Sequence, residues 1–321
     1  MSQQDATTPR TADLSALAER VVVANAPCSY GAFEITVGID PNVPNEIELL
    51  DLVAEAGYQG IDLGPVGYLG LGEELRERLE SRGLGLAGGY LGLPFSEPER
   101  LKDHMPALDA LLDVFDAAPS GGLRPKPTLA DAGSEIRSAL PGRSAIDPSV
   151  GWDDAAWKRF AEGLAVVVDR CRERGYEPTF HHHTATYVEA HWEIEKLLEI
   201  TDVGVCLDTG HLLLGRGDPV TALREWGSRI NHFHLKDARL ETLHAIVEEA
   251  APVEAIWRRK AFCALGQGDV EIDAVLETLQ EIGYEGWLVV EQDILPDPDE
   301  PVGVAAEDQR HNREFLRARG L

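Results

Sequence analysis

The chain has 321 residues, 44% of them hydrophobic and 26% charged, which is the composition of an ordinary globular protein. Its 29 Lys and Arg residues against 56 Asp and Glu residues give a formal net charge of −27. Nucleic-acid backbones and anionic membrane surfaces repel so acidic a chain, so we expect it to bind neither nucleic acid nor membrane.

The cysteines and the apolar runs indicate a reducing compartment. The four cysteines, Cys28, Cys171, Cys206 and Cys263, form no CxxC pair, and two of them stand in apolar runs, as buried thiols do. No run approaches the roughly 18 apolar residues of a membrane span, and the polar first residues contain no secretory signal. We therefore expect a cytoplasmic protein with an N-terminal extension over residues 1–20.

Strand and helix signals alternate from residue 21 onward. The run 21–26 is short, apolar and rich in β-branched residues, and the helical spacing of apolar residues over 44–57 stops at Gly57. The pattern continues with a strand at 60–64, a helix at 71–82, a strand at 84–90 and a helix at 99–117. Residues 118–150 are richer in Gly, Pro and Ser, and we expect an inserted loop there with one strand near 128–131.

The same alternation fills the second half of the chain. Its predicted elements are, in order, a helix at 153–175, a strand at 177–182, a helix at 188–200, a strand at 203–208, a helix starting at Asp218-Pro219, a strand at 230–235, a helix at 272–282, a strand at 287–291 and a helix at 307–319. About eight strands, each followed by a helix, predict a single (β/α)8 TIM barrel over residues 21–321. No glycine-rich phosphate loop follows the first strand, which disfavours an open, doubly wound sheet.

Potential metal ligands end four late strands of the predicted barrel. His181 ends the fifth strand, Asp208 the sixth, His234 the seventh and Glu291 the eighth. The first three are each about one βα repeat apart, and an inserted loop at 238–265 accounts for the longer interval before Glu291. Since the chemistry of such barrels takes place at the C-terminal ends of the strands, we expect these four side chains to meet at one point.

Mixed imidazole and carboxylate ligands suit a divalent metal ion. We expect Mn²⁺, with Co²⁺, Fe²⁺, Zn²⁺ and Mg²⁺ as alternatives. Each residue also has a plainer interpretation: His181 belongs to a chance run of three histidines, Asp208 caps a helix, and Glu291 is a solvated loop residue. Four suitable side chains at four successive strand ends favour the metal site over coincidence.

Four motifs resemble those of the xylose-isomerase-like sugar phosphate isomerase/epimerase family. They are Asp208-Thr209-Gly210-His211, His232-Phe233-His234-Leu235-Lys236-Asp237, Gly266-Gln267-Gly268-Asp269-Val270 and Trp287-Leu288-Val289-Val290-Glu291. The resemblance implies a TIM barrel with a metal held by Asp208, His234 and Glu291.

The fifth strand departs from the pattern of that family. The family commonly has Glu-Asn-His there, whereas this chain has His181-His182-His183, so the first ligand position falls on His181. The triple histidine, followed by Thr184-Ala185-Thr186, resembles the inosose dehydratase (2-keto-myo-inositol dehydratase) branch. Epimerases of the family use two metal-bound carboxylates as acid and base, so the missing Glu weakens the prediction of an epimerase.

The expected chemistry begins with removal of a proton beside a carbonyl group. A metal bound to the oxygens of a 2-keto polyol acidifies that carbon, and loss of a β-hydroxyl then completes a dehydration. We expect His211, His183 and Lys236 to take part in proton transfer, and Tyr30, Glu34 and Asp131 to bind the substrate. For Lys236 the alternative is a structural ion pair with Asp237 or with another acid at a strand end.

The resemblance and the ligand set together predict a metal-dependent lyase that dehydrates a keto-cyclitol or keto-sugar, with 2-keto-myo-inositol as the first choice. Three alternatives stay open: a ketose isomerase or 3-epimerase, an enzyme of metal-dependent β-elimination on an oxidised glycoside, and a catalytically inactive barrel that binds a metabolite. The family resemblance also implies a homodimer or homotetramer.

Overall fold

The structure is a computed structural model that describes residues 13–119, 122–297 and 303–321. Nine strands form its main sheet, in the order β3-β2-β1-β11-β8-β7-β6-β5-β4, and every neighbouring pair is parallel. The strands are β1 (Val21–Asn25), β2 (Gly60–Ile61), β3 (Gly85–Leu86), β4 (Gly88–Leu93), β5 (Lys126–Asp131), β6 (Thr179–His181), β7 (Gly204–Asp208), β8 (Ile230–Leu235) and β11 (Gly286–Val290).

The two end strands of that order are consecutive pieces of chain separated only by Ala87. β3 pairs with β2 and β4 pairs with β5, so this bent segment closes the sheet into a barrel. The predicted TIM barrel is confirmed. The single strand predicted at 84–90 is wrong in one respect, since it is bent into two. The bend precedes Gly88 and Gly89, where a Cβ would lie 3.0 Å from the Lys126 carbonyl oxygen and 2.8 Å from Leu111 Cδ1.

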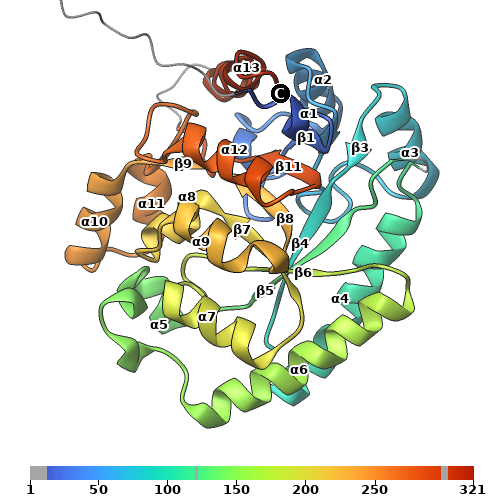
Figure 1. Cartoon of the computed structure of the whole chain (residues 1–321). Coiled ribbons are helices and arrows are strands. Elements are labelled where there is room, and N and C mark those ends of the chain that lie inside the picture. Colours follow the sequence, from blue (N-terminus) through green and yellow to red (C-terminus); the bar gives the residue numbers. More distant parts are fainter. Residues whose placement is uncertain (1–12, 120–121, 298–302) are drawn as a thin grey trace, which may run out of the picture.

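Helices surround the ring of strands, as Figure 1 shows. They are α1 (Ser15–Ala18), α2 (Glu46–Ala56), α3 (Gly72–Glu80), α4 (Pro98–Asp116), α5 (Glu135–Ala139), α6 (Asp154–Glu173), α7 (His191–Ile200), α8 (Thr209–Leu214), α9 (Pro219–Trp226), α10 (Leu240–Glu248), α11 (Glu254–Arg258), α12 (Ile272–Glu281) and α13 (Val304–Arg317). The first and last described helices pack against other helices of the barrel: α1 packs against α12, and α13 packs against α2.

Local sequence signals set the helix ends. The Asn45 side chain accepts hydrogen bonds from the first turn of α2, and the Glu48 carboxylate accepts one from the Asn45 backbone N–H, which completes a capping box. Gly57 ends α2 with a φ of 88°, a left-handed conformation that glycine adopts without steric cost. The Asp218 side chain caps the N-terminal end of α9, and Pro219 follows at the first helical position.

The hydrophobic core lies between the barrel and the inner faces of these helices. Fully buried leucines of α2 and α4, including Leu49, Leu50, Leu108 and Leu111, belong to one large cluster. Because the cluster covers the outer faces of the strands, the strands are held in place and their C-terminal ends are rigid platforms for polar side chains.

Two segments between barrel repeats carry structure of their own. Residues 122–150 include β5, the short helix α5 and two 3-10 turns at Arg143–Ala145 and Pro148–Val150. Residues 238–265 hold α10 and α11, and β9 (Asp237–Ala238) pairs antiparallel with β10 (Phe262–Cys263) at the base of the segment. Neither the short helices nor this hairpin was predicted from the sequence.

The first residues of the chain are described only in part. Residues 1–12 of the predicted N-terminal extension lie outside the described residues, as do residues 120–121 of the first predicted loop. Residues 15–18 form α1, whose Leu17 is fully buried against the barrel. Among the helices that the structure describes, none is both long and apolar enough to cross a membrane.

Candidate functional site

Four side chains from successive strands meet at the C-terminal end of the barrel. The ligand atoms of His181, Asp208, His234 and Glu291 all lie within 4.8 Å of one another, and all four residues are buried. His234 Nδ1 is 3.1 Å from Glu291 Oε2 and 3.2 Å from His181 Nε2. Asp208 Oδ2 is 3.7 Å from His181 Nε2 and 3.8 Å from His234 Nδ1.

The register of the strands explains this convergence. Asp208 lies opposite His234 in the β7–β8 pair, and His181 lies opposite Cys206 in the β6–β7 pair. Glu291 follows β11 directly, one residue beyond the position where Val290 lies opposite Leu235. Since side chains two residues apart on a strand face the same way, the polar residues at these ends point into one space.

Asp208 has two roles in the structure. Its Oδ1 accepts hydrogen bonds from the backbone N–H groups of Gly210 and His211, both at 2.9 Å, and so caps α8. Its Oδ2 faces the other ligands. The plainer interpretation as a helix cap and the interpretation as a metal ligand therefore apply to different oxygens of one carboxylate.

Lys236 brings a positive charge into the same cluster. Its Nζ lies 3.1 Å from Asp208 Oδ2, 3.0 Å from Glu291 Oε2 and 3.0 Å from Asp293 Oδ2. These three carboxylates raise the pKa of Lys236 well above its usual value, although burial acts in the opposite direction. Its ion-pair partners are therefore the acids at the strand ends, and Asp237 is bound elsewhere.

His183 and His211 stand side by side next to the lysine, with ring centroids 4.0 Å apart. His211 Nδ1 is 2.7 Å from Thr184 Oγ1, and its Nε2 is 3.1 Å from Lys236 Nζ. Because the ammonium group only donates, His211 Nε2 accepts this hydrogen bond and its Nδ1 carries the proton. His183 Nδ1 lies 2.7 Å from the Thr184 carbonyl oxygen, which only accepts, so the lone pair of His183 is on Nε2.

Burial and the lysine control the protonation of this group. Burial lowers the pKa of His183 and, more strongly, that of His211, and the charge of Lys236 acts in the same direction. For Asp208 and Glu291 burial acts in the opposite direction, but Lys236 and the neighbouring histidines hold both pKa values well below the usual range. At neutral pH the site therefore contains neutral imidazoles at positions 183 and 211 beside ionised carboxylates.

A cavity of about 220 Å³ opens above these residues. Its polar wall is formed by Asp62, Tyr90, His181, His183, His234, Lys236, Glu291 and Asp293. Its apolar wall is formed by Ala26, Pro27, Ala32, Phe33, Pro65 and Trp257. A concave site with convergent polar groups of shifted pKa at the C-terminal end of a barrel has the form of a small-molecule site.

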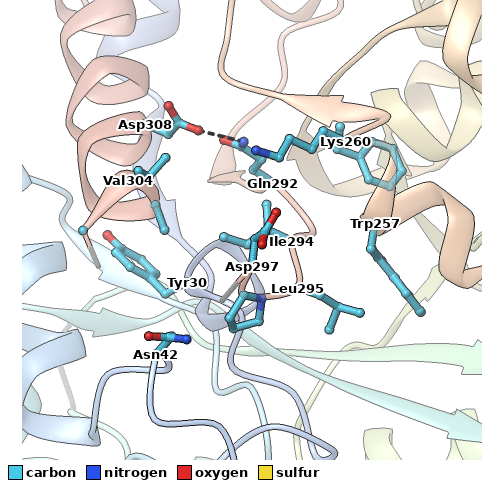
Figure 2. Close-up of a pocket in the computed structure, with 14 residues that line it drawn as sticks. Tyr30, Asn42, Trp257, Lys260, Gln292, Ile294, Leu295, Asp297, Val304 and Asp308 are labelled. Atoms are coloured by element: carbon cyan, nitrogen blue, oxygen red, sulfur yellow. Dashed lines mark hydrogen bonds between the residues drawn. The ribbon is translucent and has the colours of Figure 1, made fainter. Parts of the chain in front are cut away.

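The three residues predicted to bind substrate lie in three different places. Glu34 lines the cavity and is exposed. Tyr30 is buried and lines a neighbouring cavity of about 90 Å³, which Figure 2 shows, together with Trp257 and Gln292. Asp131 ends β5, where its Oδ1 accepts a hydrogen bond from Gly133, and it lines neither cavity. Of the residues predicted for proton transfer, His183 and Lys236 line the main cavity, whereas His211 lies behind them.

Sequence reasoning missed several residues of the cavity, including Asp62, Tyr90, Trp257 and Phe33. Asp62 follows β2, and its Oδ2 lies 3.8 Å from His234 Nε2. The strand-end rule that selected the four ligands would have found it, because β2 ends at the preceding residue. Tyr90 reaches the site from β4, with its ring 5.6 Å from that of His183, and Trp257 comes from α11. No local signal marks these two aromatic residues.

The four convergent residues fit a divalent metal ion. Two imidazoles and two carboxylates form a mixed nitrogen and oxygen set of the kind that Mn²⁺, Fe²⁺, Co²⁺ and Zn²⁺ accept. The set has a supporting shell, since the backbone N–H of Asp208 donates to His182 Nε2 and Asp62 stands behind His234. His183, His211 and Asp293 form a second group of the same type. The ammonium of Lys236 stands within 3.1 Å of His211 and Asp293, so this second group already has a cation.

Comparison with known proteins gives three findings. A sequence model of the family described as "Xylose isomerase-like TIM barrel" matches residues 50–319. The inosose dehydratase of Lacticaseibacillus casei is 28% identical over 276 residues, which are 82% of this chain and 87% of that protein. The inosose dehydratase of Geobacillus kaustophilus (strain HTA426) is 28% identical over 262 residues, or 78% and 80% of the two chains. A crystal structure of IOLI protein "with a binding zinc atom" superposes with a TM-score of 0.65 and 15% identity over 93% of this chain and 98% of that chain, which shows the shared fold.

Proposed function

The chain belongs to the xylose isomerase-like TIM barrel family, and from this premise we propose that it is a metal-dependent carbon–oxygen lyase that dehydrates a keto-cyclitol, 2-keto-myo-inositol. Relatives named inosose dehydratase align with about four fifths of the chain and support this substrate class. The observation that carries the proposal is the meeting of His181, Asp208, His234 and Glu291 beside a cavity that also contains a lysine and a neutral histidine.

We propose that these four residues hold one divalent cation, Mn²⁺ in the first place. A cation at this position supplies Lewis acidity, which polarises a ketone and lowers the pKa of the neighbouring C–H group. The two imidazoles also suit Zn²⁺ and Co²⁺, and the zinc atom bound by IOLI protein, which shares the fold, supports the choice of a divalent ion.

The residues of this chain divide the proton transfers between them. In the proposed reaction His183 Nε2, which holds a lone pair, removes the proton beside the ketone. The electron pair of that C–H bond forms the new double bond, and the bond to the β-hydroxyl breaks. The ammonium of Lys236 gives its proton to the departing oxygen, which leaves as water. His211 accepts a hydrogen bond from Lys236 and keeps the ammonium aimed at the cavity.

The fifth strand separates this proposal from an epimerase. An epimerase that works with two metal-bound carboxylates needs an acid at the position of His181. Here the acids of the cluster stand on one side, at Asp208, Glu291 and Asp293, and the fifth strand presents imidazoles. One base and one acid of different kinds suit an elimination better than the return of a proton to the opposite face.

An assay on the metal-loaded protein tests the proposal. Purified protein with Mn²⁺ is mixed with 2-keto-myo-inositol, and the product is followed by mass spectrometry for the loss of one water. We expect a hydroxy-enone or its diketone tautomer, lighter than the substrate by one water, in wild-type samples and none after chelation. Solvent deuterium incorporated without loss of water would assign an isomerase or epimerase instead. Release of an alcohol from an oxidised glycoside would assign β-elimination.

The compartment and the oligomeric state of the enzyme are part of the same proposal. We propose that it acts in the cytoplasm as a homodimer or homotetramer on a small-molecule polyol. Light scattering coupled to size-exclusion chromatography measures the assembly, and a monomer at micromolar concentration would contradict it.

A further inference from the structure

The cavity presents two different surfaces to a bound molecule. The ligands, His183 and Lys236 form the polar wall, while Phe33 and Trp257 form part of the apolar wall. The two aromatic rings lie next to each other in a tilted arrangement, with centroids 6.2 Å apart and an interplanar angle of 47°. Both side chains are half-buried, so their faces are available to a ligand at the entrance of the cavity.

The two rings come from segments far apart in the sequence. Phe33 lies in the loop after β1, where its backbone N–H donates to Thr36 Oγ1 at 2.9 Å. Trp257 lies on α11, inside the segment that the β9–β10 hairpin attaches to the barrel. Each segment is fixed by its own hydrogen bonds, so the aromatic pair stands at a defined distance from the metal ligands.

A saturated six-membered ring with equatorial hydroxyl groups matches this division. Its hydroxyl and carbonyl groups lie around the rim, and its two faces present C–H groups. The rim would meet the polar wall, and one C–H face would lie on the aromatic rings, which supply large apolar contact. An open-chain polyol carries hydroxyl groups along its whole length and has no such face.

We propose that Trp257 and Phe33 form an aromatic platform that selects cyclic, all-equatorial polyols over open-chain ones. This inference rests on the proposed function for the identity of the reaction, since it deepens the substrate class of the same site. All hydroxyl groups of 2-keto-myo-inositol are equatorial, because the one axial hydroxyl of myo-inositol is replaced by the ketone. The platform therefore fits the proposed substrate better than it fits a linear ketose.

The neighbouring cavity gives Trp257 a second role in selection. Figure 2 shows Trp257 beside Lys260, Ile294 and Leu295, at the edge of the pocket of about 90 Å³. Trp257 is the residue that lines both cavities within the described part of the chain. Its indole therefore stands between the two, and its truncation would join them and remove the surface against which a ring is held.

Binding measurements with unreactive polyols test the platform. Titration calorimetry compares scyllo-inositol, an all-equatorial ring, with sorbitol, a linear polyol of the same carbon number. We expect W257A to weaken scyllo-inositol binding by about tenfold and to change sorbitol binding by less than about twofold. W257F keeps an aromatic ring and should retain most of the affinity. W192F replaces a tryptophan that packs against Trp157 away from the cavity, and serves as the matched control.

Fluorescence and kinetics complete the test. Scyllo-inositol should change the tryptophan emission of the wild-type protein, and the change should vanish in W257F. With 2-keto-myo-inositol, W257A should raise KM by about tenfold and leave kcat within about threefold. Equal weakening of both polyols, unchanged scyllo-inositol binding by W257A, or no scyllo-inositol binding by the wild-type protein would each overturn the platform. If the binding difference is found but 2-keto-myo-inositol is not turned over, the platform stands and the proposed function falls.

Discussion

Arg137 and Lys236 are the two most deeply buried cations of the described residues, and they are surrounded very differently. Arg137 of α5 and Lys236 after β8 each expose only 1% of their side chain, and each touches carboxylates that are almost fully buried. One cluster ties two loops together, and the other lines the cavity. Burying a charge is costly unless partners replace water, so the completeness of the partners indicates what each cluster does.

The Arg137 cluster is held largely by backbone hydrogen bonds, although among the described residues Arg137 Nη1 and Glu193 Oε1 have no hydrogen-bond partner. The guanidinium lies 2.9 Å from Glu193 and 3.2 Å from Glu189. Backbone N–H groups of Gly142 and Ala185 donate to Glu189, and those of Glu189 and Ala190 donate to Glu193. The network joins the segment after β5 to the loop after β6 and lines neither of the two cavities described above, so we assign it to stability.

The Lys236 cluster has more acceptors than donors. One ammonium serves three carboxylates, and within the described part of the chain Glu291 and Asp293 receive no backbone N–H group on their side chains. The imidazole of His181, which burial keeps neutral by lowering its pKa, adds a further lone pair. The comparison teaches that burial alone does not mark a functional charge. A functional charge is marked instead by an excess of buried acceptors that line a cavity, because such a cluster can take up a second cation and act on a substrate.

The largest expected effect is the loss of activity in D208N. Asn keeps the cap of α8, because its oxygen can still accept from Gly210 and His211, while one charged ligand oxygen is lost. We expect kcat to fall by about a thousandfold and metal content by elemental analysis to fall with it. D218N makes the same change at the cap of α9 and should keep full activity. A D208N protein with normal turnover would remove Asp208 from the metal site.

The R137M protein, which lacks the guanidinium, should unfold more readily than any variant of the cavity residues. Two buried carboxylates lose their cation, and we expect the free energy of unfolding to fall by about 3–5 kcal/mol in urea titrations. Burial raises the pKa of Glu189 to about 7. A raised acid pKa stabilises the fold below the unfolded value and loses that effect as pH rises, so the loss should be larger at pH 8 than at pH 5. K158M, at an exposed lysine, should change stability by less than about 0.5 kcal/mol.

The histidine that faces the cavity should dominate the pH profile. His183 must be neutral to accept a proton, and burial lowers its pKa below the usual 6.5. We therefore expect kcat/KM to be full at neutral pH and to fall only as pH drops below 6.5. H183N should lower kcat by about a hundredfold and abolish this acid limb. H104N, at an exposed histidine on α4, should leave the profile unchanged, and an acid limb that survives in H183N would point to another base.

The smallest effect separates the two clusters by their response to metal. In K236M the three carboxylates lose their ammonium, but a divalent ion held by Asp208 and Glu291 can replace part of its charge. We expect Mn²⁺ to raise the Tm of K236M by about 2 °C more than that of the wild-type protein, measured by calorimetry. R137M and the control K126M, at the far end of β5, should gain no more than the wild-type protein does. An equal gain in all four proteins would mean that the lysine and the metal do not share a site.

More of the barrel than of its loops could be predicted from the sequence. Hydrophobic runs marked most strands of the barrel because parallel strands are buried on both faces. The break at Ala87 was missed, since it depends on how closely Gly88 and Gly89 approach β5 and α4. The helices α10 and α11 and the hairpin that joins them were missed as well, because their apolar residues pack against parts of the barrel distant in sequence.

The candidate site was predictable where it depends on the barrel and unpredictable where it depends on loops. His181, Asp208, His234 and Glu291 converge because strand ends must meet at one rim, which the sequence spacing expresses. Tyr30 and Asp131 also stand near strand ends, yet a 3-10 turn directs Tyr30 to the neighbouring cavity and a turn holds Asp131 at Gly133. Trp257 reaches the cavity only through the path of a long insertion, which no local pattern encodes.

Asp237 gives this insertion an unusual independence. Its carboxylate accepts hydrogen bonds from the backbone of Ala238, Gly266, Gly268 and Val270, so the departure and the return of the segment are fastened at one residue. At Gly268 a Cβ would lie 2.3 Å from Asp237 Oδ1, which is why the loop that returns to the barrel needs a glycine there. The stretch between these anchors is therefore attached to the barrel at a single residue. Another sequence could replace it at the same attachment and change which molecules enter the cavity, while the residues at the strand ends stay the same.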